Sequence, residues 1–192
     1  MTIMNWAKWL PVLAAGLVAS GCMTAGTAGR DTSNPITAGP VAGRCYPGGC
    51  SWFDIRSFEM VRETERGALL RLDTREGGST HAMSADAPRS SRGVRIDWGP
   101  YSNDAYVFCS RELPAVITRA QDGSYEVLRL DLISGGVPQE FLRTQYGHVC
   151  HEAGELDSDG AVERLGYRPL RDGEEREFTL RSPEAIFDRL GR

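Results

Sequence analysis

Two histidines and a glutamate stand close together in residues 148–152, which read His-Val-Cys-His-Glu. If this run is helical, His148 and His151 share a face, and Glu152 lies one turn beyond His148. Imidazole nitrogens and a carboxylate can bind zinc, and His81 could supply a third imidazole. The same groups could act as acid and base in a hydrolase. Because the zincin pattern His-Glu-x-x-His is absent, we favour a solvated helix face beside a disulfide.

An acidic run further on matches part of a calcium-binding loop. Loop positions 1, 3, 5 and 9 are acidic, and they are Glu155, Asp157, Asp159 and Glu163. Loop position 6 is a glycine, Gly160. Position 12 should carry a bidentate glutamate, but it is Gly166. An acidic surface turn is therefore the better interpretation.

Other side chains with chemical potential lack a supporting pattern. Residues 78–81 place a hydroxyl near an imidazole, but a catalytic triad is assembled in space, and no Gly-x-Ser-x-Gly elbow is present. Trp52, Phe53, Trp98 and Tyr101 could line a ligand groove, although aromatic residues of a β-rich domain more often lie in its core. No catalytic residue is assigned, and no cofactor is expected.

Four cysteines follow residue 44, which is the even number expected for disulfides in an exported protein. Three pairings are possible, and we favour Cys45–Cys50 with Cys109–Cys150. The residues between Cys45 and Cys50 read Tyr-Pro-Gly-Gly, which favours a tight turn. Redox or metal-binding roles are weaker alternatives, because neither a Cys-x-x-Cys nor a Cys-x-x-Cys-His motif is present.

The chain begins with the three parts of a secretory signal. Residues 1–8 carry one positive side chain, Lys8, and Trp9–Ala19 is an apolar core of about 11 residues, well short of the roughly 20 that span a bilayer. Residues 17–22, Leu-Val-Ala-Ser-Gly-Cys, resemble the lipobox of bacterial lipoproteins. The resemblance implies cleavage before Cys22, a diacylglycerol on its thiol, and an acyl chain such as palmitate on its new amino group.

The lipoprotein resemblance also implies a location in the cell. Several acyl chains hold a protein stably to a membrane, whereas one chain binds reversibly. In this class an aspartate after the lipidated cysteine tends to retain the protein at the inner membrane, and here that residue is Met23. The expected location is therefore the periplasmic face of the outer membrane.

The net charge of the chain limits the classes of partner that it is expected to bind. The 192 residues contain 22 Lys and Arg against 26 Asp and Glu, and Lys8 in the leader is the only lysine. Without residues 1–21 the balance is 21 − 26 = −5. A mildly acidic chain is not expected to bind nucleic acid, which requires a basic face. The expected partners are the membrane, through the lipid anchor, and an envelope protein.

Composition divides the chain into three segments. Residues 1–21 form the signal peptide, and 22–44 form the lipid anchor and a flexible tether, because this stretch is rich in small and turn-forming residues and lacks strand or helix periodicity. Residues 45–192 are long enough for one globular domain.

Residue patterns in 45–192 predict an α+β fold with a mainly antiparallel sheet and one or two short helices near the C-terminus. Hairpins are expected over 54–74 and 115–132, with the Asp122-Gly123 turn in the second, and further strands over 94–98 and 105–110. Residues 74–92 are polar and predict a long exposed loop. Helices are expected over 142–153 and 182–190, the latter starting at Ser182-Pro183.

These features favour a lipid-anchored envelope protein that binds or supports a partner without catalysis. The alternatives are a periplasmic hydrolase that uses carboxylates or the His148/His151 pair, and a small-ligand or inhibitor lipoprotein.

Overall fold

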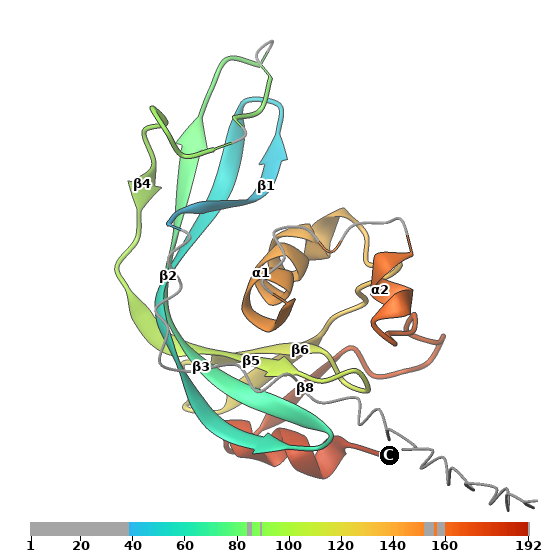
Figure 1. Cartoon of the computed structure of the whole chain (residues 1–192). Coiled ribbons are helices and arrows are strands. Elements are labelled where there is room, and N and C mark those ends of the chain that lie inside the picture. Colours follow the sequence, from blue (N-terminus) through green and yellow to red (C-terminus); the bar gives the residue numbers. More distant parts are fainter. Residues whose placement is uncertain (1–38, 84–85, 89, 152–155, 157–159, 192) are drawn as a thin grey trace, which may run out of the picture. The chain divides into compact units, whose positions relative to one another are not determined.

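The computed structural model describes residues 39–83, 86–88, 90–151, 156 and 160–191, and these are built around one antiparallel sheet (Figure 1). Seven of the eight strands follow the order β1-β2-β3-β5-β6-β7-β8, and the eighth, β4, pairs with β3 beside β5. Their bounds are β1 Val41–Tyr46, β2 Gly49–Thr64, β3 Gly67–Thr80, β4 Asp97–Trp98, β5 Ser102–Cys109, β6 Ala115–Arg119, β7 Tyr125–Arg129 and β8 Glu177–Leu180. The helices are η1 Val137–Gln139, α1 Glu140–His151, α2 Ala161–Arg164 and η2 Pro183–Arg189, where η marks a 3-10 helix. The expected antiparallel sheet and short helices are confirmed.

The long β2–β3 hairpin bends because its pairing is interrupted. The register shifts between Ile55 and Ser57 and again between Met60 and Arg62, which leaves one extra residue in β2 at each point. Such bulges bend a strand and redirect side chains. The hairpin curves around α1 in Figure 1, and the first bulge leaves Arg56 outside the regular pairing.

Two hydrophobic cores occupy the two faces of the sheet. Adjacent residues of one strand alternate between the cores, as the period of two requires: Leu70 and Val107 pack in the first core, and Leu69 and Phe108 in the second. The first core includes Tyr146 and Val149 of α1 together with Val162 of α2, and the second includes Ile186 of η2. The sheet therefore lies between α1 and α2 on one face and η2 on the other.

Both predicted disulfides are present. Cys45–Cys50 joins a directly paired residue couple across the β1–β2 turn, and Cys109–Cys150 joins the end of β5 to α1 across a sequence separation of 41. Cys22 and the leader lie outside the described residues. No helix in the described ranges is long and apolar enough to cross a membrane.

Three predicted segments differ in the structure. Strand β1 begins at Val41, inside the segment expected to be a tether to residue 44, because pairing with β2 stabilises a stretch that shows no pattern of its own. Strand β3 continues to Thr80, into the expected loop, since β2 pairs with it along its whole length. Of residues 94–98, only Asp97–Trp98 form a strand.

The C-terminal helix is a 3-10 helix, whereas the sequence predicts an α-helix. Pro183 stands in its first turn as expected, but Ser182 makes no side-chain capping hydrogen bond. Ile186 nevertheless lies fully buried in the second core. The apolar pattern of this segment therefore predicts its buried face, whereas the type of helix differs from the prediction.

Helix α1 lies against the edge strand β1. Gly43 leaves room for Phe141, because a Cβ there would lie 2.2 Å from Phe141 Cδ2. The Thr144 hydroxyl lies 3.2 Å from the Gly43 carbonyl and 3.0 Å from the Glu140 carbonyl, so its one hydrogen is shared between them. The β1 register shifts at Gly43. The sheet edge is thus bulged and touched by a helix at one point.

Candidate functional site

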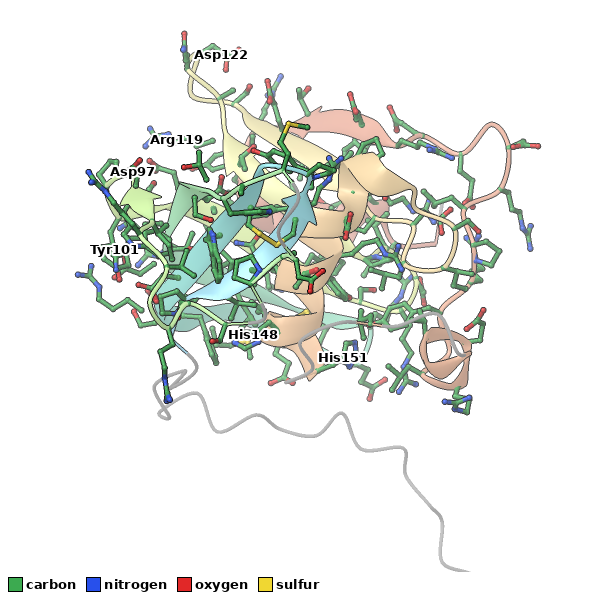
Figure 2. The ribbon with its side chains drawn as sticks, turned by 90° about the horizontal axis from the view of Figure 1, so that it is seen from above. Asp97, Tyr101, Arg119, Asp122, His148 and His151 are labelled. Atoms are coloured by element: carbon green, nitrogen blue, oxygen red, sulfur yellow. A yellow bond between two sulfur atoms is a disulfide. The ribbon has the colours of Figure 1, made fainter. Side chains whose placement is uncertain are left out.

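The two histidines highlighted by the sequence lie near the C-terminal end of α1 and have different surroundings (Figure 2). The His148 ring packs edge-on against Phe53, with 6.0 Å between centroids. The His151 Nε2 lies 2.7 Å from Tyr167 Oη. Glu152 is outside the described residues, and His81 follows β3, where its amide donates to the Gly48 carbonyl at 3.0 Å.

Within the part of the chain that the structure describes, no group of three or more His, Cys, Asp and Glu side chains is placed to hold a metal ion. Of the calcium-loop acids, Glu155, Asp157 and Asp159 fall outside the described residues. Glu163 lies in α2, three residues after Gly160. The Ser79 hydroxyl of the Ser-Thr-His segment accepts a hydrogen bond from Trp52 Nε1 at 2.8 Å, which is a structural contact.

His151 ends a chain of hydrogen bonds inside the first core. The Tyr167 and Tyr146 hydroxyls are 3.1 Å apart, and the Tyr146 hydroxyl accepts from the Ser110 amide at 3.1 Å and donates to the Ser110 carbonyl at 3.3 Å. Burial raises the pKa of Tyr167 and raises that of Tyr146 well above 10. Both phenols therefore stay protonated. The Tyr146 hydroxyl satisfies the buried backbone of Ser110, next to the Cys109–Cys150 disulfide, and the Tyr167 hydroxyl links it to His151.

A more open arrangement lies on the sheet face opposite α1. Arg71 and Asp73 alternate with Leu70 and Leu72, which face α1 in the first core, so the two charged side chains point to the other face. A groove of about 510 Å³ follows this face. Its lining comprises Arg56, Ser57, Phe58, Glu59, Arg71, Leu72, Asp73, Tyr101, Ser102, Asn103 and Asp104. Hydrogen-bonding side chains therefore predominate in it.

One end of the groove is built on a stack that we name the arginine–aromatic ladder: Trp98, Arg75, Tyr101 and Arg56. The Arg75 guanidinium lies 4.5 Å from the Trp98 ring centroid and 4.6 Å from that of Tyr101. The Arg56 guanidinium lies 4.3 Å from the same Tyr101 ring. Cation–π contacts of this length are attractive and orient the guanidinium planes.

Asp54 binds two members of the ladder, Arg75 and Tyr101, through hydrogen bonds. Its Oδ2 accepts hydrogen bonds from Arg75 Nη2 at 2.8 Å, from Arg75 Nε at 3.1 Å and from the Tyr101 hydroxyl at 2.7 Å. The bond to Asp54 raises the pKa of Tyr101, so the phenol remains a donor. Gly77 makes room for Trp98, since a Cβ there would lie 2.7 Å from Trp98 Cε3.

The groove's cations are paired with its acids. Arg56 Nε donates to Asp73 Oδ2 at 2.6 Å, and Arg71 pairs with Glu59. Asp104 lies 3.8 Å from Arg119, whose position is visible in Figure 2. Two arginines and three acids give the lining a charge of −1, and both arginines are neutralised. The groove is therefore better suited to hydrogen bonding with a polar ligand than to binding a phosphate or carboxylate group.

The sequence singled out Tyr101 and Trp98 but missed Arg56, Arg75 and Asp54. Trp52 and Phe53, proposed with them, are fully buried. These residues could not be found without the strand register. The pairing of Asp54 with Arg75 depends on how β2 and β3 are aligned, and a bulge in β2 sets the direction of Arg56. Neither is readable from residue types alone.

Comparison with known proteins adds no relative: no protein-family model, curated protein or solved structure matches this chain.

Proposed function

We propose that this chain is a lipid-anchored protein of the bacterial cell envelope that binds a polar partner through the groove on the outer face of the β2–β3 hairpin. Its acylated Cys22 would hold it at the periplasmic side of the outer membrane. The groove of about 510 Å³ is the observation that carries the binding role.

The groove is prepared for binding more than for catalysis. Its side chains are held by hydrogen bonds, ion pairs and ring stacking, so little conformational entropy is lost when a ligand arrives. Its lining contains no histidine or cysteine, and its hydroxyls at Ser57 and Ser102 have no imidazole beside them in that lining. A partner with hydroxyl, amide or amine groups would exchange hydrogen bonds with this surface.

The anchor can be tested by intact mass. Protein extracted from membranes should lack residues 1–21 and should carry the added mass of a diacylglycerol and an acyl chain. A Cys22→Ala variant should show neither change. Wild-type protein cleaved elsewhere, or cleaved without added mass, would refute the anchor.

The groove can be tested by photo-crosslinking in cells. A photoreactive amino acid at Asn103, inside the groove, should trap an envelope component that the same group at Gln121, in the β6–β7 turn, does not trap. Adding Arg71→Ala should lower the yield from position 103. Identical products from both positions would show that the groove is not the binding surface.

A further inference from the structure

The exposed apolar side chains of the described chain gather at one end of the sheet. Among the described residues, the only large apolar side chains that are exposed are Tyr46, at 50%, and Met83, at 78%. Tyr46 ends β1 and Met83 follows β3, yet they meet at the same turn. A Cβ on Gly48 would lie 3.6 Å from Met83 Cγ, and the His81 amide binds the Gly48 carbonyl.

We name this end of the molecule the apolar tip, formed by Tyr46, Pro47, Ala82 and Met83, all of them exposed. None of the four carries a charge. Figure 1 shows the β1–β2 turn and the end of β3 together, away from the end of the sheet that holds η2. Within the described ranges, the large exposed apolar side chains thus lie together at this end, as they would at a surface that contacts a membrane or a partner.

The tip is also rigid. The Cys45–Cys50 disulfide links the paired residues directly behind the turn, and Tyr46 pairs with Gly49. Gly48 has φ 94°, in the left-handed region that glycine favours, which closes the turn after Pro47. The turn that carries Tyr46 and Pro47 is therefore restrained, and little order has to be gained there when it meets another surface.

We propose that the apolar tip inserts into the headgroup region of the bilayer to which the chain is anchored, an inference that rests on the lipidation of Cys22. Four side chains are far fewer than the roughly 20–30 per side of a standard protein–protein interface. A bilayer interface accepts so small a surface, and tyrosine is enriched there because its ring is apolar and its hydroxyl is polar.

The length of chain between anchor and tip permits the contact. Residues 23–40 can span at most about 65 Å, at up to 3.6 Å per residue, and β1 covers about 20 Å more. An anchored tip meets the membrane at a high effective concentration, so weak partitioning suffices to hold it there. Insertion would fix one orientation of the β2–β3 hairpin, and of its groove, relative to the membrane.

Depth-dependent fluorescence quenching tests the proposal on the full lipidated protein. Tyr46→Trp protein is reconstituted into phosphatidylethanolamine–phosphatidylglycerol vesicles that contain a lipid with brominated acyl chains. The indole at position 46 should be quenched and its emission shifted to the blue, after subtraction of the wild-type signal. Gln121→Trp, at the exposed β6–β7 turn, is the matched control and should stay unquenched.

A second probe protects the test against a misfolded variant. Met83→Trp should be quenched like Tyr46→Trp, and a Met83→Ser change in the Tyr46→Trp protein should lower the inserted-to-free ratio about tenfold. Gln121→Ser in the same background should leave that ratio unchanged.

The outcomes separate the tip from the anchor. Protein that does not float with the vesicles refutes the anchor. Protein that floats, with equal quenching at positions 46, 83 and 121, refutes tip insertion and leaves the anchor intact. Crosslinking of an envelope protein from position 46 in cells, without quenching in vesicles, would assign the tip to a protein partner and overturn the bilayer proposal.

Discussion

At the scale of single residues, Asp54 holds two members of the arginine–aromatic ladder, Arg75 and Tyr101. One carboxylate oxygen accepts three hydrogen bonds from two side chains of the ladder. Its side chain is only 13% exposed and that of Arg75 28%, so water replaces these bonds poorly. The orientation of Arg75 and Tyr101 therefore depends on one largely buried negative charge, whereas Arg56 is held by Asp73.

Asp54→Asn should lower the free energy of unfolding by about 1–3 kcal/mol, because hydrogen bonds to a charged group are lost and an arginine is left uncompensated. Denaturant unfolding followed by circular dichroism measures the change. Asp97→Asn is the matched control: Asp97 and its partner Arg95 are 86% and 93% exposed, and the change should stay within about 0.5 kcal/mol. Equal losses in the two variants would contradict the role given to Asp54.

Tyr146→Phe should be destabilising by about 1–3 kcal/mol, since it leaves the Ser110 amide and carbonyl without their partner in a site where Ser110 is 3% exposed. Thermal unfolding should show a lower Tm. Tyr46→Phe removes the same atom from a half-exposed ring and should have almost no effect. A neutral Tyr146→Phe would mean that other groups satisfy Ser110.

At the scale of elements, Glu174 organises the segment between α2 and β8. It accepts from Arg168 Nη2 at 2.8 Å and from the Arg171 amide at 3.0 Å, and Arg129 lies 3.6 Å away. These bonds, with that from Arg168 the most important, lower its pKa from 4.5 to about 2. The segment is thus held by a carboxylate that must be ionised.

This pKa shift predicts the acid sensitivity of the protein. Because the folded pKa lies below the unfolded one, the stabilisation is complete above about pH 5 and is lost as the pH falls towards 2. The Glu174 side chain is 23% exposed, so screening limits the effect to about 1 kcal/mol. Glu174→Gln should flatten the fall in stability between pH 5 and 2, whereas Glu175→Gln, 59% exposed, should not. Parallel curves for wild type and Glu174→Gln would contradict this.

The elements also show what residue patterns can predict. The β6–β7 hairpin and helix α1 were predicted because their apolar residues recur at the periods of a strand and a helix. Residues 74–80 were not, because Glu76, Gly77 and Gly78 show no alternation and form a strand only through their neighbours β2 and β4. The groove could not be predicted for the same reason, since its residues are brought together by the strand register and the bulges of β2.

At the scale of the whole molecule, the two disulfides differ in what they close. Cys109–Cys150 joins sheet and helix α1 across 41 positions, and Cys45–Cys50 closes only five. In the chain-entropy model, loss of the first costs about 4 kcal/mol and loss of the second about 2 kcal/mol.

Cys109→Ser/Cys150→Ser should therefore be much less stable than Cys45→Ser/Cys50→Ser in denaturant unfolding under oxidising conditions. The second variant should keep its fold and lose rigidity at the apolar tip. A larger loss of unfolding free energy on removing Cys45–Cys50 would contradict this order and would mean that the apolar tip contributes more to stability than the link between β5 and α1.

The contact between α1 and the bulged edge at Gly43 has a consequence for assembly. An open edge strand is a template on which a second copy can add a strand, and bulges and covering helices are two ways in which proteins prevent this. Gly43 combines both, because its bulge interrupts the ladder while Thr144 occupies its carbonyl and Phe141 lies on its Cα. Gly43→Ala would push α1 away from the strand, and we expect its first symptom to be self-association at high concentration.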